Sequence, residues 1–330
     1  MTVTQSPAPA AVPAAPPGWL RQVTPGPALA TLIVFAAALA LTQGLGFTHG
    51  ATLILRTAIL ALAAVSLSFL IGQCGLVSFG HAAPVGIGAY AVLISGEYGV
   101  TNVLAVLPLA AGAAALFSAA TGLIALRTRG VYFIMITLSF AQMAFYVAAS
   151  LSAFGGDDGM AIAARSTFFG VRFLKSDLSL AILAVALLVI ALALFGRIAA
   201  SRFGLMLRAG RANEAKLSAL GLSPYRHRLI ALAMAGAAAG IAGALLANQV
   251  EYVSPATMGW HMSGELIVMV VLGGIASPGG AVVGAIAISL LDEILGHTTE
   301  HWRLGLGLVI VAVVLLRGRD LKALLTGGAK

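Results

Sequence analysis

Apolar runs long enough to cross a lipid bilayer recur along this chain from Ala28 almost to Arg317. A helix needs roughly 20 apolar residues to span the hydrocarbon core of a membrane. Composition agrees, because 60% of the 330 residues are hydrophobic and only 9% are charged, whereas about 25% are charged in soluble domains. The mean hydropathy is +1.02. The sequence therefore predicts an all-α polytopic membrane protein.

About ten segments are predicted to be membrane helices, with boundaries set by where the apolar runs stop. They are residues 28–47, 51–71, 80–95, 103–126, 131–154, 178–195, 229–249, 263–276, 279–295 and 305–316. Three of them, 80–95, 263–276 and 305–316, are shorter than a full crossing. These either extend into flanking polar residues or are broken inside the protein. The expected number of helices is therefore eight to eleven.

The distribution of Lys and Arg predicts the orientation, because loops on the inner side carry the excess of both. With the N-terminus inside, the inner loops hold 14 of the 19 basic residues. The outer loops hold four, Arg165, Arg172, Lys175 and Arg303, and Arg56 falls within a predicted helix. Both termini are thus predicted to be cytoplasmic. Residues 1–25 are expected to form a disordered tail, 26–318 the transmembrane domain and 319–330 a short C-terminal tail.

Several kinds of chemistry lack their motifs in this sequence. There is no G-x-x-x-x-G-K-[ST] loop to bind ATP phosphates, and HTTEH at 297–301 has its glutamate misplaced for a zinc protease. Asp157 and Asp158 lack the ligand spacing of an EF-hand. The single cysteine, Cys74, cannot form an internal disulfide. We predict no catalytic residue, metal, cofactor or nucleic-acid partner, and the net charge of +8 comes largely from basic inner loops.

The longest polar inner loop, 199–228, has the sequence signals of a short helix. Asn213 can cap its start, Glu214 lies in the first turn, where the helix dipole favours an anion, and Gly221 can end it in the left-handed conformation. Ser223 and Pro224 are typical of the cap and first position of the next helix. Such a helix can insert into a groove on a cytoplasmic partner. The alternative is an ordinary basic loop that orients the protein.

Four stretches carry a family resemblance. The inner loop resembles the EAA-type coupling loop of ABC importer permeases, through Glu214, Ala215 and, seven residues after Glu214, Gly221. Three others resemble the LivM-type permease of branched-chain amino acid importers: GQCGLVSFGHAAPVGIGAY from Gly72, RTRGVYFIMITLSFAQM from Arg127 and ELIVMVVLGGIASPGGAVVGA from Glu265. The chain departs from the family at Ala83-Pro84, where a small residue is usually followed by an aromatic one.

The resemblance implies an ABC importer permease bundle in the bacterial inner membrane, bound to lipid. Its implied partners are a second, LivH-like permease, two cytoplasmic ATPase subunits and a periplasmic substrate-binding protein. The implied cargo is a branched-chain or similar aliphatic amino acid, and related permeases also carry urea and short amides. A stand-alone secondary transporter and a structural subunit stay open as alternatives. The residues expected to couple to the ATPases are Arg208, Arg211, Asn213, Glu214, Ala215 and Gly221.

Uncharged polar side chains within or near predicted helices are candidates for the translocation path. They are Gln73, Ser78, His81, Thr137 and Gln142. Ordinary hydrogen bonding between helices is the alternative for each of them. The acids Glu251, Glu265, Asp292 and Glu293 are expected near water at the outer boundary, which argues against a proton relay. The outer loop 155–178 is the largest on its side and the expected docking surface for a binding protein.

Overall fold

The computed structural model describes residues 26–44, 50–162, 165–167, 176–275, 277–296 and 307. Both predicted tails lie outside the described residues, as does the predicted segment 305–316 apart from Gly307. The described chain is almost entirely helical. Its α-helices are α1 Gly26–Gly44, α2 Gly50–Phe69, α3 Ala82–Glu97, α4 Val103–Ala125, α5 Val131–Ser150, α6 Asp177–Ala200, α7 Arg202–Ala212, α8 Glu214–Ala219, α9 Pro224–Val250, α10 Trp260–Gly273 and α11 Pro278–Gly296.

The remaining elements are short. A π-helical turn, η2 Leu70–Cys74, continues α2, and two 3-10 turns are η3 Ser152–Phe154 and η5 Pro255–Met258. Strands β1 Met160–Ala161 and β2 Tyr252–Val253 pair antiparallel. They join the segment after α5 to the segment after α9, far apart in the sequence.

Nine of the ten predicted segments coincide with helices in the described part of the chain. Six helices are long and apolar enough to cross a membrane. Three shorter apolar helices, Gly26–Thr42, Ala82–Glu97 and Trp260–Gly273, correspond to α1, α3 and α10. The all-α membrane class is thereby confirmed. The count of about ten crossings and the orientation of both termini stay predictions.

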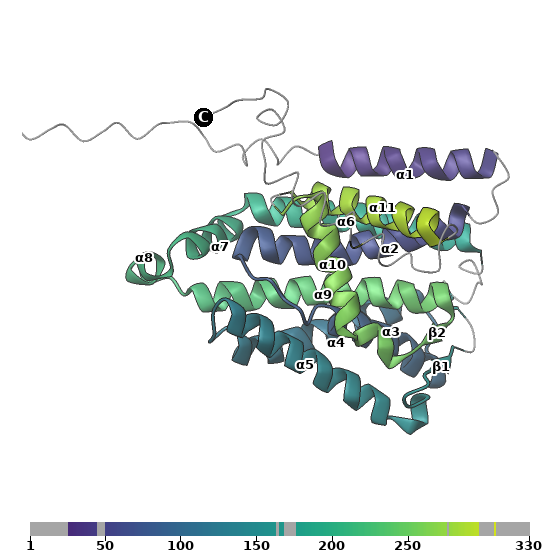
Figure 1. Ribbon diagram of the computed structural model, residues 1–330, viewed down its shortest axis with the longest axis horizontal. Coiled ribbons are helices and arrows are strands. Elements are labelled where there is room, and N and C mark those ends of the chain that lie inside the picture. The colour runs from purple at the N-terminus through teal and green to yellow at the C-terminus, as the bar shows by residue number, and fades with distance from the viewer. Residues whose placement is uncertain are drawn as a thin grey trace, which may run out of the picture.

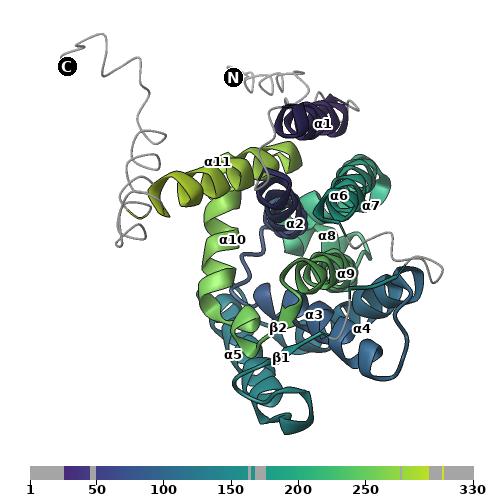
Figure 2. The same ribbon diagram turned by 90° about the vertical axis from the view of Figure 1, so that its right-hand side faces the viewer.

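Most of the long helices lie along one direction, and α10 crosses them steeply between α3 and α11 (Figure 1). We call the end that carries α7 and α8 the α8 end, and the end that carries the two strands the β1–β2 end. Helix α2 occupies the centre of the bundle, in contact with α1, α6, α9, α10 and α11 (Figure 2). Its apolar residues are accordingly buried, with Leu55, Ile59, Leu62 and Leu67 inaccessible or nearly so.

Helices α3, α4 and α9 pack closely because glycines bring their backbones together. A methyl group on Gly88 would overlap the backbone of Gly240, and one on Gly243 would overlap the carbonyl of Val85. A methyl group on Gly236 of α9 would overlap the side chain of Ser118 of α4. Helices in lipid gain no hydrophobic advantage by associating, so close backbone approach supplies the attraction. Glycines at these positions therefore serve dense helix packing.

The chain turns back into the bundle after α2. Gly75 ends η2 with φ +70°, and no regular helix forms before α3 begins at Ala82. His81 then lies beside Ser66 of α2, with Nε2 2.7 Å from Oγ. Because Ser66 precedes the end of η2 by eight residues, α3 starts well inside the bundle. The short predicted segment 80–95 is therefore a helix broken inside the protein, which lipid tolerates only where such backbone is covered.

Candidate functional site

The loop between α6 and α9 folds into two helices with the predicted caps. Asn213 Oδ1 accepts a hydrogen bond from the Lys216 backbone at 3.0 Å, and α8 begins at Glu214. Gly221 follows the end of α8 with φ +77°, and its N–H donates to Ser218. Ser223 caps α9, whose first residue is Pro224. These predictions are confirmed, but the preceding eleven-residue helix α7 was not predicted.

Glu214 ties α8 to two other parts of the bundle. Its Oε2 lies 2.5 Å from Nη2 of Arg129, in the connection between α4 and α5, and its Oε1 pairs with Arg228 of α9. Arg228 also donates to the Gly210 carbonyl of α7 at 3.1 Å. The side chains of Glu214 and Arg228 are 24% and 15% exposed, so this pair is partly shielded from water. One carboxylate thus connects α8 with the α4–α5 connection and the start of α9.

Two arginines of α7 contact the end of α2. Arg208 Nη1 donates to Gln73 Oε1 at 2.7 Å and to the Ala199 carbonyl at 2.6 Å. Burial lowers the pKa of Arg208, yet an arginine stays charged in proteins. Arg211 Nη1 donates to the carbonyls of Gly72 and Ile71 at 2.5 and 3.3 Å. A cation at the end of a helix matches the negative end of its dipole, so α7 is held against η2.

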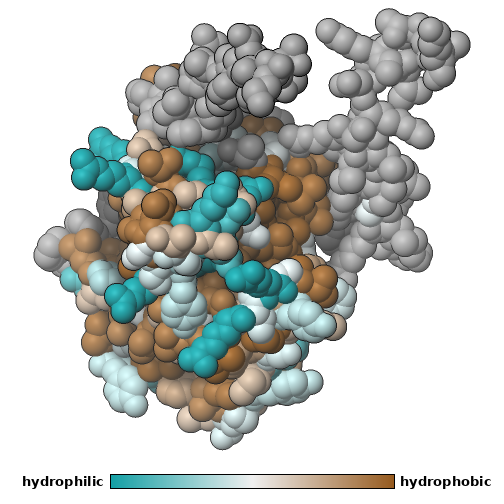
Figure 3. All heavy atoms as spheres, turned by 90° about the vertical axis from the view of Figure 1, so that its left-hand side faces the viewer, coloured by the Kyte–Doolittle hydropathy of each residue, from teal (hydrophilic) through white to brown (hydrophobic). Residues whose placement is uncertain are grey.

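A polar pocket of about 430 Å³ opens beside α8. Its lining residues are Arg129, Gly210, Arg211, Ala212, Asn213, Glu214, Ala215 and Ser218. Four of the six predicted coupling residues line it, whereas Arg208 contacts Gln73 and Gly221 follows α8. Figure 3 views this end of the molecule, where hydrophilic side chains are spread over the exposed face among apolar ones.

The predicted path residues lie in three places. Gln73 accepts a hydrogen bond from Arg208 of α7, one of the predicted coupling residues. His81 and Ser78 are buried, and Thr137 of α5 packs against Gly80, between them in sequence. The Ala82 N–H beside them donates to Ser263 Oγ of α10 at 3.0 Å. Helices α3, α5 and α10 thus meet at this junction, and Gln142 lies farther along α5, half-buried. That these residues line a path stays a prediction.

Replacing Ser66 with alanine is expected to destabilise the protein. The hydroxyl donates to the Ala63 carbonyl at 2.7 Å, so it accepts from His81 Nε2. A buried N–H left without an acceptor costs about 1–3 kcal/mol. The melting temperature of the purified chain in detergent should fall by about 2–6 °C.

The matched control for this prediction is Ser68→Ala on the same helix. The Ser68 hydroxyl is buried and has no partner in the described part of the chain, so its removal should cost little. Equal melting temperatures for the two variants would contradict the importance of the Ser66–His81 bond.

The structure offers no metal site within the residues that it describes. No group of three or more His, Cys, Asp or Glu side chains there is placed to hold an ion. His261 stacks on Trp260 with ring centroids 3.7 Å apart. The residues of the HTTEH stretch, among them His297, Glu300 and His301, lie outside the described residues.

Sequence comparison identifies the protein family of this chain. A family model described as "Branched-chain amino acid transport system / permease component" matches residues 51–315, most of the chain. The chain belongs to this permease family. It is therefore a multi-pass membrane protein of the branched-chain amino acid ABC transporter permeases, whose members are transporter components rather than enzymes.

Two relatives are similar over most of this permease. The high-affinity branched-chain amino acid transport system permease protein LivM of Escherichia coli (strain K12) is 29% identical over 316 residues, which cover 89% of this chain and 74% of the relative. LivM of Salmonella typhimurium (strain LT2) has the same identity and coverage. No solved structure matches the permease.

Proposed function

We propose that this permease forms half of the transmembrane channel of an ATP-driven importer of branched-chain or similar aliphatic amino acids. The observation that carries the proposal is the arrangement of Glu214, which holds the capped helix α8 beside a polar pocket through Arg129 and Arg228. A partner that displaces a short helix held in this way would also displace α9 and the α4–α5 connection. The cargo is inferred from the LivM relatives, whose names specify branched-chain amino acids.

The α8 end faces the cytoplasm in this proposal. Nine of the eleven Lys and Arg residues in the described ranges lie at that end. The other two, Arg56 and Arg165, lie toward the β1–β2 end. This asymmetry supports the orientation, because basic residues are retained on the cytoplasmic side of bacterial inner membranes.

The transport cycle would use partners on both faces. A loaded periplasmic binding protein docks at the β1–β2 end, and a second, LivH-like permease completes the channel. Two cytoplasmic ATPases close on ATP and displace α8 and α7. Arg208 and Arg211 pass that displacement to η2 and to the non-helical segment that leads to His81. A rigid-body change of this kind alternates access between the two faces, and uncharged residues such as Thr137 let the zwitterion leave.

The experiment is reconstitution of the complete importer in liposomes with labelled leucine. Uptake should require ATP, the binding protein and both permeases. Leucine uptake by this chain alone, without ATP, would instead establish a secondary transporter. Uptake of urea or a short amide, with leucine ineffective as a competitor, would reassign the cargo within the same class of importer. ATP hydrolysis by the assembled subunits with no transport of any of these solutes would support a purely structural role.

A further inference from the structure

Helices α6 and α9 form a hairpin whose connection is the loop that carries α7 and α8. The two helices are not packed tightly along their whole length. An apolar cavity of about 220 Å³ separates part of them, lined on α6 by Leu187, Ile190 and Leu194 and on α9 by Met234, Ala237 and Ile241. A displacement of the connecting loop therefore needs a fixed point elsewhere to become a defined movement of the hairpin.

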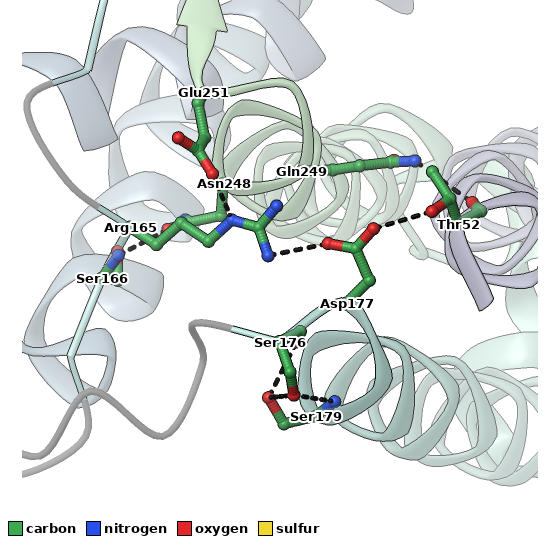
Figure 4. Close-up of polar contacts among 9 residues, drawn as sticks. All are labelled: Thr52, Arg165, Ser166, Ser176, Asp177, Ser179, Asn248, Gln249 and Glu251. Atoms are coloured by element: carbon green, nitrogen blue, oxygen red, sulfur yellow. Dashed lines mark hydrogen bonds and ion pairs between the residues drawn. The ribbon is translucent and has the colours of Figure 1, made fainter. Parts of the chain in front are cut away.

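That fixed point lies at the opposite end, where Arg165 bridges the two helices (Figure 4). Its Nη1 lies 2.8 Å from Oδ1 of Asp177, the first residue of α6. Its Nε donates to Oε1 of Glu251, directly after α9, at 2.7 Å. Asp177 also accepts a 2.7 Å hydrogen bond from Thr52 of the central helix α2. One guanidinium thus joins the ends of α6 and α9, and through Asp177 also α2.

The backbone around Arg165 is anchored independently of its side chain. The Ser166 N–H donates to the buried Oδ1 of Asn248 at 2.7 Å, and the Thr167 carbonyl accepts from Val103 at 2.8 Å. The Arg165 side chain itself is only 14% exposed. A partly buried arginine that binds two carboxylates from a fixed backbone holds both of them in one geometry, because the guanidinium group is planar and rigid.

Glu251 adopts a conformation that favours glycine. It has φ +56° and ψ +24°, and no other non-glycine residue in the described ranges has a positive φ. Glycine is the common residue where a helix ends in this left-handed conformation. A carboxylate held there at a conformational cost points to a role for its side chain, and that side chain reaches Arg165.

We propose that Arg165 is a positioning residue that fixes the β1–β2 ends of α6 and α9, so that a displacement of α7 and α8 pivots the hairpin about that end. The fixed point is a property of the isolated chain. Its use in transport rests on the proposed importer function. Two experiments therefore address the two parts separately.

The first experiment measures spin-label distances in the purified chain, with labels at the exposed positions Ile182 of α6 and Val250 of α9 and with Cys74→Ala. With Arg165 present, the distribution of distances between the two labels should be narrow. Arg165→Ala should make this distribution about twice as wide. Arg165→Lys should give an intermediate width, because one ammonium cannot reproduce the planar guanidinium group. The control is Asp157→Asn, an exposed acid of the same connection, which should change nothing. A narrow distribution in Arg165→Ala would overturn the fixed point.

The substitution Glu251→Gly distinguishes the positioning effect of the Arg165–Glu251 ion pair from an effect on the overall stability of the chain. Glycine relieves the left-handed backbone, so the melting temperature should equal or exceed that of the parent chain. The spin-label distribution should nevertheless widen, because one arm of Arg165 is lost. A lower melting temperature with an unchanged distribution would show that Glu251 serves only local folding.

The second experiment uses the assembled importer. Arg165→Ala should lower amino acid uptake per ATP hydrolysed by about threefold while the hydrolysis rate stays close to that of the parent importer. Unchanged uptake per ATP would overturn the pivot, even where the distance measurements succeed. Absence of ATP-driven uptake by the parent importer would count against the proposed function alone, since the distance measurements need no partner.

Discussion

Glu214→Lys is expected to reduce ATP-driven uptake by about tenfold or more while the protein stays folded in the membrane. The substitution replaces two ion pairs with three neighbouring cations, because Arg129 and Arg228 flank the position. Loss of a partly buried pair costs about 1–4 kcal/mol, and each 1.4 kcal/mol corresponds to a factor of about ten. The buried contacts of the membrane helices do not depend on this side chain. Uptake into proteoliposomes and the amount of protein in the membrane fraction are the two measurements.

Two variants show whether the effect belongs to this position. Glu97→Lys makes the same charge change at an exposed residue at the end of α3 and should leave uptake unchanged when the binding protein is saturating. Glu214→Gln keeps the shape and removes the charge, so its uptake should be intermediate. Full uptake in Glu214→Lys would remove α8 from the coupling route. Loss of the protein from the membrane would instead show that Glu214 is needed for folding.

Gly243→Val is expected to prevent stable folding. The added side chain would meet the Val85 carbonyl of α3 across a backbone contact that has no flexible atom to yield. Overpacking costs typically 1–3 kcal/mol and more when backbones must separate, which is a large part of a total stability of about 5–15 kcal/mol. The monodisperse fraction in size-exclusion chromatography should fall sharply, or the melting temperature should drop by about 5–10 °C.

The control for this packing prediction is Gly112→Val on the neighbouring helix α4. An added Cβ at Gly112 meets no other atom within 4 Å, so the chain should tolerate valine there. Both substitutions replace a glycine within an apolar helix by the same residue, and they differ in what the new side chain touches. Similar behaviour of the two variants would mean that helix propensity, rather than the α3–α9 contact, determines the outcome.

Local signals in the sequence predicted most helices and the caps of the coupling loop. Asn213, Gly221 and Ser223 carry their signals in their own chemistry, so the ends of α8 and the start of α9 followed directly. Helix α7 was missed because two glycines and three arginines in eleven residues are typical of a basic loop. Its stability comes from Arg208 and Arg211, which bond to η2 about 140 positions earlier in the chain.

Tertiary geometry accounts for what the sequence could not predict. The steep crossing of α10 depends on which helices it meets, and no pattern within 260–273 specifies that (Figure 1). Gln73 was predicted to line the path because it is polar beside an apolar run, and its hydrogen bond with Arg208, 135 positions later, could not be predicted. The sequence predicted Glu251 near water. Its pairing with Arg165 could not be predicted, because the two residues lie 86 positions apart. Composition and capping thus predict elements, whereas pairings between distant residues require the fold.

The contact between α3 and α9 also sets an order of events during synthesis. Val85 and Gly243 lie 158 positions apart, and domains emerge from the ribosome N-terminal part first. Helix α3 has sixteen residues and follows a non-helical stretch. Lipid offers few hydrogen-bond partners to the backbone N–H and C=O groups of that stretch. Helix α3 therefore completes its packing only after α9 has been translated. Ribosome-bound chains that stop before residue 224 should hold α3 in an unfinished, protease-accessible form.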